Sequence, residues 1–286
     1  MSNIKAYLYS VKEEDCAADK WDYGLIKEVF NKNKIEQIKV TELPNTEKAF
    51  VVIPGPQNID YEEQISDELD KIDRVVLFIT GDESATFDIN KIKHKNIEVW
   101  VQYPHKKHAQ YNKLALGVPQ HLSKNLPQYQ DKSYDVFFAG QITHQRRQQL
   151  AEIMPSVPNS FYKPTTGFAE GLKPKLYYDA MSMSKIVPCP SGAEVIDSFR
   201  FYEAIEMLCL PIGDKIDSKG INTDFFNFIF GDQNSIRSVD HWQHMHDLLP
   251  HLLDIYQSEM HQIVCWWIKY KRDLSIKVMG QINAKI

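Results

Sequence analysis

The sequence contains few cysteines, and none of them are spaced like metal ligands. The 286-residue chain has Cys16, Cys189, Cys209 and Cys265, and no two are close enough for a zinc motif. Three of the four lie in apolar stretches, where buried free thiols are expected in a reducing compartment. These features predict a cytoplasmic protein without structural disulfides.

Long hydrophobic runs and a strong charge of one sign are also missing. The N-terminus, MSNIKAYLYS, has no apolar core of signal-peptide length, and the longest apolar cluster is IVCWWI at 263–268. That cluster is too short to cross a bilayer, so we expect no membrane span. The net charge of −5 gives no overall attraction to a polyanion.

Several catalytic and nucleotide-binding motifs are absent. The chain has no G-x-x-x-x-G-K-[ST], no G-x-G-x-x-G and no G-x-S-x-G, which argues against P-loop, dinucleotide-binding and α/β-hydrolase enzymes. It also lacks the D-x-D pair with which metal-dependent sugar transferases hold Mn²⁺ or Mg²⁺. The histidines of HWQHMH at 241–246 are more typical of a solvated helix than of a metal site. We therefore predict no metal site.

What the sequence does contain is an alternation of strands and helices. Hydrophobic residues make up 43% and charged residues 25%, as in soluble globular proteins, and the length suits two domains. In the first half, strands are predicted at 5–10, 49–55, 74–84 and 96–104, and helices at 22–33 and 60–72. Continuous apolar strands that alternate with amphipathic helices indicate parallel βαβ units.

A polar segment at 124–135 is predicted to be a linker, after which the alternation resumes. The second half is predicted to have strands at 135–140, 185–190 and 209–214, helices at 143–154, 174–184 and 197–208, and a helical tail from about 239. We therefore predict an α/β fold with two Rossmann-like, doubly wound domains, 1–133 and 134–286, and a cleft between them. In such sheets, ligands bind beyond the carboxyl ends of the strands.

Two strand ends of the second half carry candidate phosphate-binding residues. After the strand at 135–140, a glycine at the turn would let a ligand approach the backbone, and the next helix offers free N–H groups and cations. After the strand at 185–190, a turn leads into a helix with Arg200 and Glu203 on one face. The candidates are Gly140, Gln141, Thr143, Arg146, Ser191, Gly192, Ser198, Arg200 and Glu203.

Each of these positions also has an ordinary structural interpretation. Arg146 can be a solvated arginine after a common βα turn, and Arg200 with Glu203 can be a surface ion pair of about 0.3–0.5 kcal/mol. In the functional interpretation, Arg200 would hold a diphosphate, because its planar guanidinium suits phosphate oxygens, and Glu203 would bind two ribose hydroxyls.

The first half contains three candidate carboxylates and a basic stretch. Asp82 and Glu83 follow the apolar strand at 74–84, and Asp22 precedes a helix; each could take a proton from an acceptor hydroxyl, and either aspartate could equally cap a helix. The stretch 91–113 has six lysines and three histidines against one acid, Glu98. It could contact an anionic acceptor through Lys106, Lys107 and His108, or be a solvated surface.

The segment SKIVPCPSG…DSFRFYEAIEMLCLPI, with FFAGQITHQRR, LFITGDES and IEVWVQYP, resembles the exostosin-like glycosyltransferases over about residues 74–214. The resemblance implies a GT-B fold whose N-terminal domain binds an acceptor and whose C-terminal domain binds a nucleotide sugar without a metal. It places Ser198, Arg200 and Glu203 on the donor, with Gly192 beside them and Gly140, Gln141 and Arg146 on the phosphate side.

We therefore expect a metal-independent glycosyltransferase that needs no cofactor beyond its donor, a nucleoside-diphosphate sugar and most simply a UDP-sugar. Its acceptor would be a glycan hydroxyl or a hydroxymethylated base in duplex DNA. Two other classes remain open: a nucleotide-sugar-binding protein without turnover, and a sugar-nucleotide epimerase.

Overall fold

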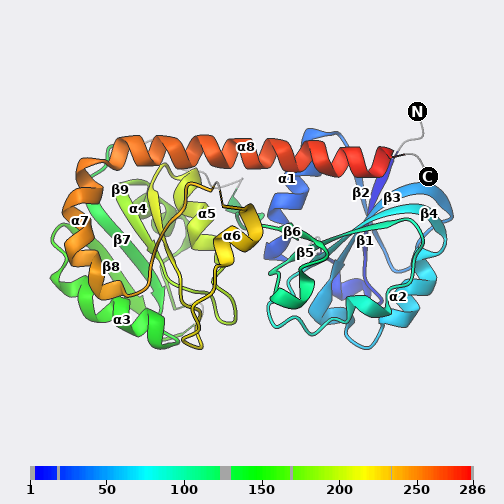
Figure 1. Ribbon diagram of the computed structural model, residues 1–286, viewed down its shortest axis with the longest axis horizontal. Coiled ribbons are helices and arrows are strands. Elements are labelled where there is room, and N and C mark those ends of the chain that lie inside the picture. The colour runs from blue at the N-terminus through cyan, green and yellow to red at the C-terminus, as the bar shows by residue number, and fades with distance from the viewer. Residues whose placement is uncertain (1–3, 18–19, 123–129, 168–169, 233, 285–286) are drawn as a thin grey trace. The chain divides into compact units, whose positions relative to one another are not determined.

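Figure 1 shows the computed structural model of the chain, which describes residues 4–17, 20–122, 130–167, 170–232 and 234–284. Residues 124–129 of the predicted linker lie outside the described residues. The chain forms two compact units: unit 1 comprises residues 1–120 and 270–286, and unit 2 comprises residues 121–269.

Unit 1 is built on a six-stranded sheet in which every strand pair is parallel. The strand order is β2-β1-β3-β4-β5-β6, so the first strand lies between the second and the third, and the chain changes direction across the sheet between β1 and β3. The strands are β1 (Lys5–Tyr9), β2 (Glu36–Val40), β3 (Thr46–Pro54), β4 (Ile72–Thr80), β5 (Ile97–Gln102) and β6 (Asn112–Leu114).

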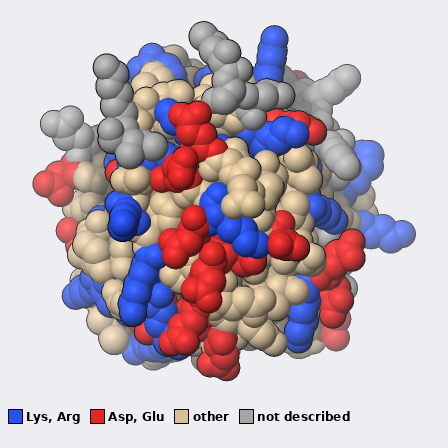
Figure 2. Space-filling model, turned by 90° about the vertical axis from the view of Figure 1, so that its right-hand side faces the viewer, with Lys and Arg blue, Asp and Glu red and all other residues tan. Residues whose placement is uncertain are grey.

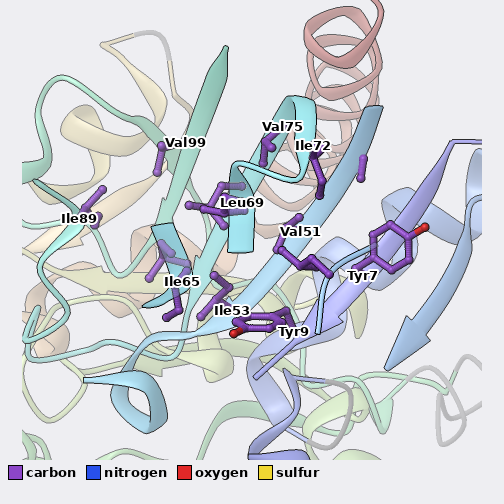
Figure 3. Close-up of a cluster of buried hydrophobic side chains, with 14 of the residues drawn as sticks. Tyr7, Tyr9, Val51, Ile53, Ile65, Leu69, Ile72, Val75, Ile89 and Val99 are labelled. Carbon is purple, nitrogen blue, oxygen red and sulfur yellow. The ribbon is translucent and has the colours of Figure 1, made fainter. Parts of the chain in front are cut away.

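Helices cover both faces of this sheet. On one face, Ile65 and Leu69 of α2 (Glu62–Leu69) pack in a buried cluster with Val51 and Ile53 of β3 (Figure 3). On the other face, the rings of Phe50 and Phe78 lie 5.1 and 5.8 Å from that of Phe30 in α1 (Gly24–Lys32). Burial on both faces explains why these strands are continuous apolar runs.

The C-terminal helix α8 (Tyr256–Asn283) completes unit 1 with its last turns. Leu274, Val278 and Ile282, spaced four apart, are buried there. Polar contacts fix the helix as well: the Asn33 amide donates to Ser275 Oγ at 2.8 Å, and the Trp100 indole N–H donates to Gln281 Oε1 at 2.8 Å. Among the described residues, no helix is both long and apolar enough to cross a membrane.

Unit 2 has a five-stranded parallel sheet in the order β11-β10-β9-β7-β8. Its first strand, β7, has the second strand on one side and the third on the other, so the chain changes direction between β7 and β9. The strands are β7 (Tyr134–Gln141), β8 (Ser160–Thr165), β9 (Ser184–Cys189), β10 (Leu210–Asp214) and β11 (Arg237–Val239). The helices are α3 (Gln145–Ile153), α4 (Pro174–Ser182), α5 (Phe199–Glu206), α6 (Phe225–Phe230) and α7 (Met245–Asp254).

The α/β class and the parallel sheets predicted from the sequence are confirmed, and both sheets begin in the doubly wound order 2-1-3-4-5. The division into 1–133 and 134–286 stays a prediction. The compact units differ from it mainly at the C-terminus, since residues 270–286 belong to unit 1.

Candidate functional site

The carboxyl ends of β7 and β9 form the switch point of unit 2, where open α/β sheets bind ligands. The two strands are neighbours in the sheet, and β7 ends at Gln141 while β9 ends at Cys189. The segments that follow them lead into α3 and α5. Most of the phosphate-binding candidates predicted from the sequence are therefore brought to one edge of one sheet.

Arg200 lies across the end of β7. One guanidinium N–H donates to the Ala139 carbonyl at 2.9 Å, and the guanidinium carbon lies 4.7 Å from the centre of the Phe138 ring. The Arg200 guanidinium can lie there because residue 140 is a glycine and has no side chain. A Cβ at Gly140 would lie 2.4 Å from Arg200 Nη2, and Gly140 has φ +151°, a conformation that favours glycine.

Three polar atoms at this edge are buried without a hydrogen-bond partner among the described residues: Arg200 Nε, Ser198 Oγ and His144 Nδ1. Ser198 is the N-cap of α5, yet its hydroxyl does not cap the helix. Buried polar groups are nearly always paired in folded proteins, because leaving one unpaired costs about 1–3 kcal/mol. Three such atoms at one edge of the sheet indicate a place where a polar ligand supplies the missing partners.

The turn after β9 is held rigidly in place. The buried Ser191 hydroxyl is within 3.2 Å of the carbonyls of Gly192 and Val195, and Gly192 is itself buried. The Ser191 carbonyl accepts from His144 Nε2 at 3.1 Å and from Arg147 Nε at 3.3 Å. The Ser191 hydroxyl therefore serves the turn, while its backbone ties β9 to the start of α3.

Gln141 and Thr143 lie in the segment between β7 and α3. The Gln141 amide is 3.4 Å from the Thr166 carbonyl, and the Gln141 carbonyl accepts from Arg147 Nη1 at 3.1 Å. The Thr143 side chain is exposed. Both residues border the switch point, and their predicted contact with a donor stays a prediction.

Arg146 points away from solvent into a buried ion pair. Its guanidinium contacts Asp214 at the end of β10 with N–O distances of 2.5 and 3.1 Å, and the two side chains are 3% and 0% exposed. Asp214 also accepts from the Ser191 N–H and the Trp242 indole, each at 3.2 Å. In this structure the charge of Arg146 is neutralised within the protein, beneath the turn after β9.

Glu203 is buried on α5 between two tyrosines. Its carboxylate oxygens accept from the Tyr178 hydroxyl at 2.8 Å and from the Tyr177 hydroxyl at 3.1 Å. Burial raises the pKa of Glu203, and Tyr178, the charge of Arg200 and Tyr177 partly counteract that rise. A contact between Glu203 and ribose hydroxyls stays a prediction.

In unit 1, Asp22 lies at the carboxyl edge of the sheet. Its side chain accepts from the Tyr103 hydroxyl at 3.0 Å, and its carbonyl accepts from the Gln102 amide at 3.0 Å at the end of β5. Its second carboxylate oxygen faces Gly81, just beyond β4; a Cβ at Gly81 would lie 3.2 Å from it. Burial raises the pKa of Asp22, and Glu83 adds to the rise while Tyr103 opposes it.

Asp82 has a different environment, although it is only one residue beyond Gly81. Its carboxylate accepts from the backbone N–H and hydroxyl of Thr86 at 2.8 and 2.9 Å and from the Phe87 N–H at 2.8 Å. It is 3% exposed, so it organises the loop after β4. Glu83 is half-buried, and its carbonyl accepts from His105 Nε2 at 2.7 Å.

The basic triplet Lys106–His108 offers fewer free cations than its sequence suggests. The Lys107 ammonium donates to the Ala85 carbonyl. His108 is buried, and burial lowers its pKa to about 4, so it is uncharged at neutral pH. Lys106 is exposed. The face of unit 1 in Figure 2 likewise carries basic side chains interspersed with acidic ones.

A cavity of about 340 Å³ opens at the same edge of unit 1, beyond the ends of β1 and β2. Its lining includes Ser10, which follows β1, and Lys39 and Thr41 at the end of β2, with Glu13 from the loop that leads toward Asp22. The cavity is therefore polar and carries charges of both signs. Such a lining suits a ligand rich in hydroxyl groups.

Sequence reasoning missed His144, Tyr103 and Asp214 as members of these sites. His144 stands four residues after Gly140 at the N-cap of α3, a position that could have drawn attention to it. The pairing of Asp214 with Arg146 has no local signal. The described residues contain no group of three or more His, Cys, Asp or Glu side chains that could hold a metal ion.

The chain matches no protein-family model, and a search of curated proteins finds no match.

Proposed function

We propose that the chain is a glycosyltransferase with a GT-B fold that uses a nucleoside-diphosphate sugar, with the donor bound by unit 2 and the acceptor by unit 1. The observation that carries the proposal is the set of unpartnered buried atoms of Arg200, Ser198 and His144 at the switch point of unit 2. A guanidinium N–H and a serine hydroxyl beside a helix N-terminus are donors suited to phosphate oxygens.

The reaction we propose is a single displacement at the anomeric carbon of the sugar. The acceptor oxygen forms a bond to that carbon while the bond to the diphosphate oxygen breaks, and Asp22 takes the acceptor proton. Asp22 suits this role because one of its carboxylate oxygens faces the glycine turn at Gly81 and because burial raises its pKa. Arg200 and backbone N–H groups stabilise the charge on the departing diphosphate.

We propose a glycan or other polyhydroxylated molecule as the acceptor, bound along the carboxyl edge of unit 1 from Asp22 to the cavity beside Ser10 and Lys39. The alternative acceptor, a hydroxymethylated base in duplex DNA, needs an extended cationic surface. The Lys107 ammonium already donates to the Ala85 carbonyl, and His108 is buried and neutral, so neither adds to a cationic surface for DNA. These contacts favour the glycan as the acceptor. A gel-shift assay with duplex DNA decides between them, since DNA binding that weakens steeply with salt would establish the alternative.

Calorimetric titration with UDP and with UDP-sugars, in buffer containing EDTA, tests the donor site. We expect binding by the natural chain, and a loss of about 1.5–3 kcal/mol of binding free energy in Arg200→Ala, the range of a hydrogen bond to a charged group. Arg237→Ala is a matched control, because Arg237 is a half-exposed arginine of unit 2 that pairs with Glu259. It should bind like the natural chain.

Equal affinity of the Arg200→Ala and Arg237→Ala proteins for UDP would refute the donor site. Release of UDP from a UDP-sugar, with and without a panel of glycan acceptors, then tests turnover. Binding without release or transfer would identify a nucleotide-sugar-binding protein, and conversion of the sugar without an acceptor would identify an epimerase.

A further inference from the structure

His144 is oriented by the protein in a way that leaves one ring nitrogen for a ligand. It lies at the N-cap of α3, and its Nε2 is 3.1 Å from the carbonyl of Ser191. A carbonyl can only accept, so Nε2 carries a proton. In the neutral ring, Nδ1 is then a bare acceptor, and this atom is buried without a partner among the described residues.

Burial and the charges around His144 together lower the pKa of its ring when no ligand is present. Burial lowers its pKa most, and Arg147 lowers it further. The Ser191 carbonyl after β9 and Asp214 at the end of β10 raise it, while Arg146 on α3 lowers it. Because Arg146 and Asp214 neutralise each other in their ion pair, burial and Arg147 decide the balance.

A bound diphosphate would reverse that balance. An anion near Nδ1 repels the lone pair of the neutral ring but attracts a protonated ring, and an opposite charge within about 4–6 Å raises the pKa of a histidine. The other unpartnered groups at this edge of the sheet, Ser198 Oγ and Arg200 Nε, are both able to donate, so an anionic ligand that reaches them would satisfy them as well. A protonated Nδ1 adds a third donor.

We propose that His144 takes up one proton from solvent when a nucleotide-sugar diphosphate binds to unit 2, and that its Nδ1–H then donates to a phosphate oxygen. This inference rests on the proposed donor site. Its consequence is that donor affinity rises as the pH falls, by up to tenfold per pH unit between the pKa of the free site and that of the bound site. Product release returns the proton to solvent.

The test is calorimetric titration with UDP-glucose, whose diphosphate diester does not titrate near neutral pH. Titrations at one pH in two buffers of different ionisation enthalpy give the number of protons taken up. We expect up to one proton per bound UDP-glucose in the natural chain. In His144→Gln, whose amide can still donate to the Ser191 carbonyl, we expect no uptake and an affinity that no longer changes with pH.

His251→Gln is the matched control, because His251 is an exposed histidine of α7 in the same unit. It should keep the proton uptake of the natural chain. His144→Asn is a second variant for the case that His144→Gln does not fold, as judged by thermal unfolding. Binding without proton uptake, or uptake that persists in a folded His144 variant, would overturn the inference while leaving the donor site intact. Absence of UDP-glucose binding at every pH would overturn both.

Discussion

At the residue scale, two aspartates at the carboxyl edge of unit 1 have opposite surroundings. Asp82 accepts three hydrogen bonds within its own loop, so its charge is used to hold that loop. Asp22 accepts a hydrogen bond from the Tyr103 hydroxyl through one carboxylate oxygen, and its other carboxylate oxygen faces Gly81. The difference decides which of them can exchange a proton with a substrate.

Asp22→Asn should lower the rate of UDP release and sugar transfer by about 10²–10⁴-fold, the usual contribution of a general base. The raised pKa of Asp22 means that the folded protein holds this proton more tightly than the unfolded chain does. Any stabilisation from Asp22 is therefore present at low pH and lost as the pH rises through the folded-state pKa. At neutral pH, Asp22→Asn should keep or increase the free energy of unfolding.

The transfer rate of the natural chain should rise with pH through the pKa of Asp22, and rate measurements from pH 4 upward check this. Asp82→Asn is the matched comparison. It should lower the free energy of unfolding in urea by about 1–3 kcal/mol and leave the rate of the folded protein almost unchanged. The reverse pattern, a stable but inactive Asp82→Asn protein, would make Asp82 the base.

At the element scale, the Arg146–Asp214 ion pair fastens α3 to the end of β10 and to the turn after β9. Arg146→Met would leave Asp214 charged and buried, so we expect the free energy of unfolding to fall by about 3–5 kcal/mol. Lys185→Met is the control, since the partly exposed Lys185–Asp135 pair should contribute below about 1 kcal/mol. Urea unfolding of both proteins measures the difference.

UDP binding by folded Arg146→Met protein should stay close to that of the natural chain. If that protein were as stable as the natural chain but lost UDP binding, Arg146 would be a phosphate ligand, as the sequence alone predicts.

The sequence predicts the elements that are buried and misses those at the edges of the sheets. The strands β3, β4, β7 and β9 are continuous apolar runs, and their positions follow from that pattern. The strands β2 and β8 lie at sheet edges, and their sequences, EQIKV and SFYKPT, mix polar residues and proline with apolar ones. Local patterns fail there because pairing with one neighbour, rather than burial, defines the strand.

Some residues of the candidate site could likewise be predicted from the sequence, and others could not. Gly140 could be predicted because it lies at the end of an apolar strand, and Arg200 because it lies on the helix that follows another such strand. The structure brings the two residues into contact. The partners of Arg146 and Glu203 could not be selected, since Asp214 and the two tyrosines come from other elements. Contacts across a sheet are set by the order of the strands, which a single sequence does not encode locally.

At the scale of the whole molecule, α8 begins in unit 2 and ends in unit 1. Gln281 connects its end to the sheet: its side chain accepts from the Trp100 indole and donates to Glu98, and its carbonyl accepts from Arg74 at 3.0 Å. Gln281→Ala would leave the buried Trp100 N–H unpaired, so we expect a loss of about 1–3 kcal/mol in the free energy of unfolding.

Gln262→Ala provides the control on the same helix, because Gln262 is exposed in the part of α8 that belongs to unit 2. Amide hydrogen exchange near residues 270–283 should accelerate in Gln281→Ala and stay unchanged in Gln262→Ala. Equal exchange in the two proteins would mean that the Gln281 contacts do not hold the helix end.

Because α8 runs from unit 2 into unit 1, it also limits how the chain can be divided into separately expressed fragments. A fragment that starts at the linker would keep the apolar stripe of Leu274, Val278 and Ile282 with nothing to cover it, and would tend to aggregate through that stripe. The complementary fragment, ending at the linker, would expose the surface that the stripe seals. Isolating either half as a soluble piece therefore calls for splicing the last turns of α8 onto the N-terminal half.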